Sequence, residues 1–197
     1  MKKRFSFLFF IFTTLSSAVP AQNPADTAKI FLNLADALTH PHLVYKLQLR
    51  KLPKHQIPDT VFTAFPNLKW LDISKNKLKE IPSGIGKLSQ LEHLDASKNK
   101  LSSVPYTLGY LKQLNTLLLN QNAIETLPKE IGNLESLEVL DLWSNEIDQF
   151  PESISLLKKL KKLDLRVINI NDIAQQRIKN QLPNTEIFFS GGCNCGK

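Results

Sequence analysis

A 23-residue interval governs the middle of this chain, because one pattern of residue types returns four times between positions 68 and 159. Each unit has Leu at its first and fourth positions, an aliphatic residue at its sixth and eleventh, Asn at its ninth and Pro at its fifteenth. Leucine accordingly fills 33 of the 197 positions. A period of this length is typical of solenoids, in which each unit buries its apolar side against its neighbours. We therefore expect one elongated array.

Each unit is expected to begin as a short β-strand. Side chains alternate along a strand, so Leu71 and Ile73 point into the solenoid while the residues between them point outward. Stacked units then form a parallel sheet. Where the chain leaves that sheet, its buried backbone needs hydrogen bonds, and the Asn amide offers both a donor and an acceptor. We therefore predict a structural ladder made of Asn76, Asn99, Asn122 and Asn145.

The pattern Leu-x-x-Leu-x-Leu-x-x-Asn-x-Leu, followed by Pro-x-x-Ile-Gly-x-Leu, resembles the leucine-rich repeat family, and specifically its 23-residue Ras-suppressor-like type. The resemblance is strong over residues 68–159 and weaker on both sides. It implies an α/β solenoid shaped as a short horseshoe with a concave parallel sheet. It also implies that the concave face binds a protein or peptide.

Three segments precede the regular repeats. Residues 1–21 combine a basic start, an apolar stretch and small residues, which is the pattern of a secretory signal peptide. Export would place the chain outside the cell, in the periplasm or in the cell envelope, with a formal charge of +4 instead of +7. Residues 22–43 are expected to form an N-terminal helical cap that starts at Asn23 and carries Ile30 and Phe31 on its apolar face. Residues 44–67 fit an irregular first repeat.

Residues 160–190 are expected to hold the last strand and a C-terminal cap. The strand pattern continues, but Ile168 stands where the ladder Asn is due, so the array ends there. A helix that carries Ile173, Ala174, Ile178 and Leu182 is predicted to start at Asn171 or Asp172 and to stop before Pro183. Residues 186–189 then fit an edge strand, and residues 191–197 a Gly/Cys tail.

The outward strand residues form three columns across the predicted sheet. Asp in the second column and Ser in the third are ordinary for this repeat, so the departures are informative. Leu118 and Trp143 are apolar where their neighbours are polar, and they lie on adjacent strands, about 4.8 Å apart. We predict that the partner-binding residues of the concave face are Trp70, His93, Leu118, Asn120, Val139, Trp143 and Arg166. The alternative is that an outward Trp only covers its neighbours.

The tail holds both cysteines of the chain, Cys193 and Cys195. A disulfide, within one chain or between two, is favoured over a soft metal such as Cu(I), and two sulfurs alone do not complete a tetrahedral zinc site. No metal site and no cofactor are expected.

Known catalytic motifs are missing from the sequence, which contains no His-Glu-x-x-His, no Gly-x-Ser-x-Gly and no phosphate-binding Gly-rich loop. We therefore expect no catalytic residues and no enzymatic activity. The lysines between positions 158 and 162 lack interleaved aromatic residues, so nucleic acid is not an expected partner. No stable membrane span is expected, because the apolar stretch of the signal is too short. The sequence leaves the oligomeric state open.

Two alternatives to an exported protein-binding module remain open. One is an envelope-associated structural protein that is tethered through its cysteine tail. The other is an intracellular signalling scaffold, which requires that residues 1–21 are not a signal and places the chain in the cytoplasm.

Overall fold

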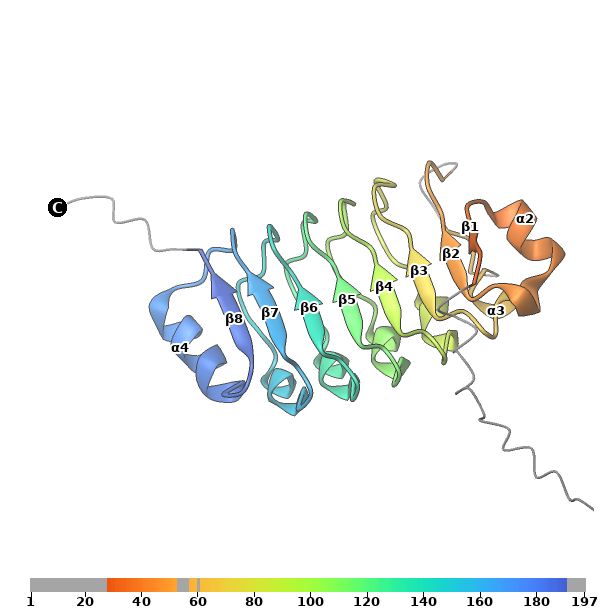
Figure 1. Ribbon diagram of the computed structural model, residues 1–197. Helices are drawn as coiled ribbons and strands as arrows, with labels where there is room; N and C mark the ends of the chain where they lie inside the picture. The colour runs from red at the N-terminus through yellow and green to blue at the C-terminus, as the bar shows by residue number, and fades with distance from the viewer. Residues whose placement is uncertain (1–27, 53–56, 60, 191–197) are drawn as a thin grey trace, which may run out of the picture.

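The computed structural model describes residues 28–52, 57–59 and 61–190, which carry one parallel sheet of eight strands (Figure 1). The strands lie in the sheet in chain order, so each coil of the chain adds one strand to its neighbour. They are β1 (Ile30–Phe31), β2 (Lys46–Gln48), β3 (Trp70–Asp72), β4 (His93–Asp95), β5 (Thr116–Leu118), β6 (Val139–Asp141), β7 (Lys162–Leu165) and β8 (Glu186–Phe189). The predicted α/β solenoid with a parallel sheet is confirmed.

The core lies directly behind the sheet. The inward residue at the middle of each strand from β2 to β7 has no exposed surface: Leu47, Leu71, Leu94, Leu117, Leu140 and Leu163. These leucines pair in register from one strand to the next. The 23-residue spacing therefore fixes which side of every strand faces the core, because one step along a strand reverses the direction of the side chain.

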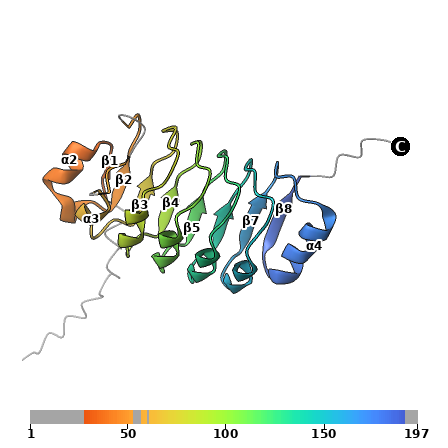
Figure 2. The same cartoon turned by 180° about the vertical axis from the view of Figure 1, so that it is seen from behind.

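Short helices form the side of the solenoid opposite the sheet (Figure 2). A four-residue α-helix, α3 (Val61–Ala64), is followed by the 3-10 helices η3 (Ser83–Lys87), η4 (Tyr106–Tyr110), η5 (Lys129–Asn133) and η6 (Glu152–Leu156). Each 3-10 helix starts after a proline whose ψ is near 145°. The fixed φ of proline suits this entry, and its missing N–H leaves no donor unsatisfied.

Glycine allows these short helices to stack closely. A Cβ at Gly109 would lie 2.4 Å from the Glu130 carbonyl oxygen of the next helix, and Gly132 is in the same situation against Ser153. Ser155 takes the equivalent place in η6, after which the chain forms a longer α-helix instead of another 3-10 turn. The glycine is therefore replaced in the coil where the stack of short helices ends.

The asparagines cross-link successive coils. Asn99 Nδ2 donates to Ile73 O of the preceding coil at 3.1 Å and to Ala96 O of its own coil at 2.9 Å. Its Oδ1 accepts from Asn76 N and Leu78 N, both at 3.0 Å. Bonds between neighbouring coils recur at Asn76, Asn122 and Asn145. These amides therefore satisfy the buried backbone where the chain turns away from the sheet.

The N-terminal cap differs from its prediction. Ile30 and Phe31 belong to strand β1 and pair with β2, so a helix carrying them is wrong. Helix α2 (Leu34–Thr39) begins only after Asn33, whose Oδ1 accepts from Asp36 N at 2.7 Å, and η1 (Pro41–Leu43) follows it. The extended backbone gains hydrogen bonds along the sheet edge and buries Phe31 next to Leu47. The start predicted at Asn23 lies outside the described residues.

The C-terminal helix and strand form where they are predicted. Helix α4 (Asp172–Gln181) has Asn171 as its N-cap, with Oδ1 accepting from Ala174 N at 2.9 Å. Ile178 is buried, whereas Ile173 is 84% exposed, so the two isoleucines of this helix lie on different faces. Ile173 precedes Ile178 by five residues, which turns the two side chains about 140° apart on a helix. The last strand, β8, pairs in parallel with β7.

Candidate functional site

The outward residues of strands β2 to β7 and of the turns that follow them make up the sheet face. Strand pairing places Trp70, His93, Thr116 and Val139 side by side in its first column. In the second column, Leu118 on β5 lies opposite Asp95 on one side and Asp141 on the other. The candidate residues therefore belong to one continuous surface.

Trp70 and His93 form one aromatic group on this face. Their rings are stacked, with centroids 5.6 Å apart and planes inclined by 13°. Burial lowers the pKa of the His93 imidazole below its ordinary value of 6.5, although the carboxylates of Asp95 and Asp72 act in the opposite direction. His93 is therefore largely uncharged at neutral pH and presents a flat, weakly polar surface.

Leu118, Val139 and Trp143 form a second, apolar group. Val139 and Trp143 flank Asp141 along the same chain segment, so they lie diagonally across from Leu118, and all three side chains are half-buried. Thr116 lies between His93 and Val139 in the first column. The structure thus brings together the members of each group, but it does not join Trp70 to Trp143, which lies three strands away.

The remaining two candidates sit beside Trp143. Asn120 is half-buried in the third column, and its carbonyl accepts from Lys98 N at 2.9 Å. Arg166 holds the Asp164 carboxylate, with Nη2 to Oδ2 at 2.6 Å, and its guanidinium carbon is 5.8 Å from the centre of the Phe188 ring. The charged end of Arg166 is therefore engaged by residues of β7 and β8.

The aspartates of the second column share one structural role. In each of them, Oδ1 accepts the backbone N–H two residues later. The distances are 2.8 Å from Ser74 to Asp72, 2.9 Å from Ser97 to Asp95, 3.0 Å from Trp143 to Asp141 and 3.1 Å from Arg166 to Asp164. Such a bond shapes the turn that follows each strand. This shared bond accounts for the recurrence of Asp at this position.

Two of the four aspartates also bind a cation, and two do not. Asp72 Oδ2 accepts from Arg50 Nη2 at 2.5 Å and from Gln48 Nε2 at 2.7 Å, and Asp164 is bound to Arg166. No lysine or arginine of the described residues pairs with Asp95 or Asp141. Burial raises the pKa of the Asp141 carboxyl, and the nearby carboxylates of Asp164 and Asp95 raise it further.

The Arg50–Asp72 pair was not predicted from the sequence. Both residues stand in the outward columns, but the first repeat is irregular, and 24 residues rather than 23 separate Leu47 from its partner Leu71. The useful signal was this register, which puts Asp72 opposite Gln48 and next to Arg50.

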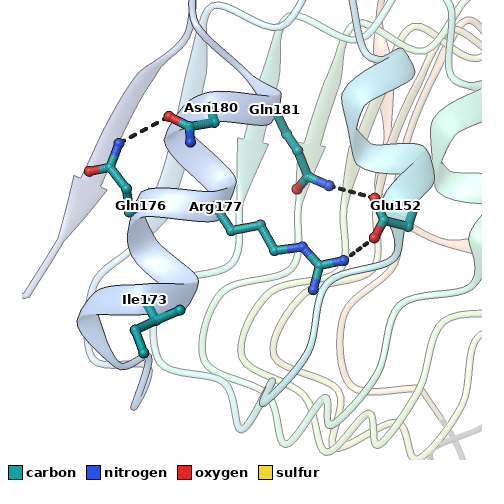
Figure 3. A pocket seen from close by; sticks show the side chains of 6 residues that line it. All are labelled: Glu152, Ile173, Gln176, Arg177, Asn180 and Gln181. Atoms are coloured by element: carbon teal, nitrogen blue, oxygen red, sulfur yellow. Dashed lines mark hydrogen bonds and ion pairs between the residues drawn. The ribbon is translucent and has the colours of Figure 1, made fainter.

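A hollow between α4 and η6 lies away from the sheet face (Figure 3). Arg177 and Gln181 both reach from α4 to the Glu152 carboxylate, Gln181 at 3.0 Å. The ion pair between Arg177 and Glu152 is exposed, so it contributes little stability by itself. These contacts attach α4 to the last coil.

The described part of the chain contains neither a candidate metal site nor a candidate membrane-spanning helix. It contains no group of three His, Cys, Asp or Glu side chains able to hold a metal ion. Over the same ranges, no helix has the length and apolar character needed to cross a membrane. Cys193 and Cys195, predicted to form a disulfide, lie outside the described residues, as do residues 1–21.

Comparison with protein families gives one match over most of the chain. A family model described as a leucine-rich repeat region matches residues 47–182, from strand β2 to the end of the cap helix. This span contains the whole sheet face from Leu47 onward, including the central strands.

Solved structures extend this comparison. The chain is 28% identical to a leucine-rich repeat protein of Leptospira interrogans, with a TM-score of 0.67, over 82% of this chain and 48% of that one. An internalin of Listeria monocytogenes is 19% identical with a TM-score of 0.63, over 81% of this chain and 45% of that one, which shows a common fold. The plant peptide hormone receptor RGFR1, in complex with RGF2, is 30% identical with a TM-score of 0.53, over 64% of this chain and 20% of that one. The chain spans about half the length of the two bacterial proteins.

Proposed function

The chain belongs to the leucine-rich repeat family, and from this premise we propose that it is a non-enzymatic recognition module that binds a protein or peptide on its sheet face. The observation that carries the proposal is the apolar group of Leu118, Val139 and Trp143. At the positions of Leu118 and Trp143, the other regular coils carry Asp, Ser or Asn. Core packing does not require this exchange, because both side chains point away from the core.

The energetics of interfaces favour this group as an anchor. Trp is enriched among the residues that dominate binding energy, because it buries a large apolar area while losing little conformational freedom. Half-buried side chains are also partly held in place before a partner arrives, which lowers the entropic cost of binding. The complex of the plant receptor RGFR1 with RGF2 supports peptide binding by a related solenoid.

The proposal is tested by selecting binders from a random-peptide display library on the immobilised full chain. We expect the selected peptides to lose binding when Trp143→Ser and Leu118→Ser are combined, with the fold retained. The matched control is Tyr106→Ser with Tyr110→Ser, which removes an exposed aromatic pair from η4 on the opposite side of the solenoid. Binders that ignore the first variant would contradict the proposal.

We also propose that the chain is exported and that residues 1–21 are removed. The basic and apolar segments at its start support this. The test is the mass of the native protein, measured by compartment with and without reductant. A mature chain starting at Gln22 outside the cytoplasm is expected, whereas a full-length cytoplasmic chain would favour an intracellular scaffold. A doubled mass that is lost on reduction would favour tethering through the tail cysteines.

We also propose that the repeats are of the 23-residue Ras-suppressor-like type. The 23-residue period and the Ile-Gly or Leu-Gly step in three of the four coils support the Ras-suppressor-like type of repeat.

A further inference from the structure

Charge is distributed unevenly along the sheet face. Both of its ends carry basic residues in the outer columns, Lys46 and Arg50 at β2 and Lys162 and Arg166 at β7. At each end, an arginine already neutralises the aspartate beside it. Among the second-column aspartates, the two that have no lysine or arginine partner in the described residues therefore lie in the middle, Asp95 on β4 and Asp141 on β6.

We call the residues around this point the central patch: Asp95, Leu118, Val139, Asp141 and Trp143. Strand pairing puts Asp95, Leu118 and Asp141 in one row across three adjacent strands. Each carboxylate accepts one backbone N–H, and each is half-buried. A half-buried carboxylate with a single hydrogen bond keeps several lone pairs for a donor from outside the chain.

The surroundings of Asp141 favour a cation. Its pKa is raised by burial and by the neighbouring carboxylates, while the Trp143 N–H and the more distant Arg166 guanidinium only partly offset this. A cationic group bound at each carboxylate would offset the repulsion between Asp141 and Asp95 and replace some of the hydration that burial has taken away.

The spacing of the row fits an extended chain. Adjacent strands lie about 4.8 Å apart, so the two carboxylates flank Leu118 at a separation of about 10 Å. Residues i, i+2 and i+4 of an extended peptide face the same way and span about 13 Å. The long, flexible side chains of Lys and Arg readily make up the difference of about 3 Å, and an arginine can in addition stack on the Trp143 ring.

On these grounds we propose that the partner presents an extended basic segment, in which an apolar residue rests on Leu118 and Trp143 and a lysine or arginine on each side binds Asp95 and Asp141. This inference rests on the proposed function of the sheet face and names the chemistry of its ligand. An acidic segment is disfavoured, because it would meet two uncompensated carboxylates.

The experiment uses the labelled full chain on an array of synthetic heptapeptides. Three matched sets carry leucine at the fourth position, serine or threonine elsewhere, and arginine, citrulline or glutamate at the second and sixth positions. Citrulline keeps the shape of arginine without its charge. We expect the arginine set to bind about tenfold better than the citrulline set, which corresponds to about 1.4 kcal/mol, and the glutamate set to bind worst.

Variants assign the charge preference to the two carboxylates. Asp95→Asn combined with Asp141→Asn keeps the backbone acceptors and should reduce binding of the arginine set to the level of the citrulline set. Glu125→Gln combined with Asp148→Asn is the control, because it removes the same charge from exposed positions outside the sheet face and should leave the preference intact.

The outcomes separate this inference from the function on which it rests. Equal binding of the arginine and citrulline sets, still lost with Trp143→Ser, would overturn the basic ligand and leave the binding face in place. A preference that survives in the Asp95 and Asp141 variant would also overturn it. Failure of all three sets, together with library binders that ignore Trp143, would overturn both.

Discussion

The β2–β3 end of the sheet face and the central patch both carry aspartate in the second column, but the carboxylate has different partners in the two regions. At the β2–β3 end, Asp72 is nearly inaccessible, with 4% of its side chain exposed, and Arg50, Gln48 and the Ser74 N–H all donate to it. In the central patch, Asp95 and Asp141 keep the same backbone bond but have no cationic partner among the described residues. The repeat therefore fixes the position of a carboxylate, whereas its neighbours decide whether it stabilises the fold or remains available to a ligand.

The largest expected effect comes from removing the two kinds of aspartate. Asp72→Ala removes the acceptor of Gln48 and the carboxylate of Arg50, which keeps its bonds to the Ser74 oxygens, and we expect it to lower the free energy of unfolding by about 2–3 kcal/mol, a figure reduced because Arg50 is one-third exposed. Asp95→Ala loses one hydrogen bond, at about 1 kcal/mol. Urea unfolding followed by circular dichroism measures both losses. Equal losses would show that the β2–β3 end and the central patch do not differ in this way.

A second change makes the central patch resemble the other coils. Leu118→Asp restores the residue that the second column carries in β3, β4, β6 and β7, but it places a third carboxylate between Asp95 and Asp141. We expect the free energy of unfolding to fall by about 1 kcal/mol at low ionic strength. Part of this loss should be recovered at high salt, because salt screens the repulsion between the carboxylates. Leu118→Asn is the neutral control and should show no such salt dependence. A salt-independent loss for Leu118→Asp would indicate that lost packing, and not charge, dominates.

The stacked His93 gives the sheet face a pH response. Because the pKa of His93 is lowered in the fold, the unfolded chain binds more protons below pH 6.5, so stability falls as the pH drops from 6.5 towards the folded pKa. The carboxylates of Asp95 and Asp72 face this ring and limit the shift. We expect NMR titration of the ring to give a pKa below 6.5, and His93→Gln to flatten the stability profile in that window. A pKa at or above 6.5 would contradict this environment.

The fold was predictable where the repeat is regular. A fixed period sets the register of every strand, and burial of the inward leucines follows from that register. It was not predictable at the N-terminal edge, where Ile30 and Phe31 fit an apolar helical face and a short strand equally well. Hydrogen bonds to β2 decide between the two, and these depend on tertiary contacts that a local pattern does not contain.

The surface was predictable by position but not by pairing. The outward columns follow directly from the period, so Leu118 and Trp143 stand out as departures. The pairing could not be predicted in the same way. The stacking of Trp70 on His93 depends on side-chain rotamers, and the ion pair between Arg50 and Asp72 depends in addition on the irregular first coil. The separation of the apolar residues into two groups, in contrast, follows from the strand register that the period sets, because Thr116 lies between them.

The smallest effect is expected for Asp141→Asn, which tests most directly how the central patch differs from the β2–β3 end. Asp141→Asn keeps an oxygen that accepts the Trp143 N–H and removes a charge that burial and two neighbouring carboxylates disfavour. Because the pKa of Asp141 is raised, its contribution to stability falls as the pH rises through the window above 3.8, so at neutral pH the charge is a cost. The variant should therefore be as stable as the parent chain at pH 7, or more stable by a few tenths of a kcal/mol.

The same substitution at the β2–β3 end should change the free energy of unfolding in the opposite direction. Asp72→Asn removes the charge that binds Arg50, so it should destabilise the chain at pH 7, whereas Asp141→Asn should not. Urea unfolding of both variants at pH 7 and pH 4 gives the comparison. If Asp141→Asn costs as much as Asp72→Asn, the Asp141 carboxylate is bound within the chain and is not available to a basic ligand. If the signs differ, a single column of the repeat holds one carboxylate that serves the fold and another that is free for recognition.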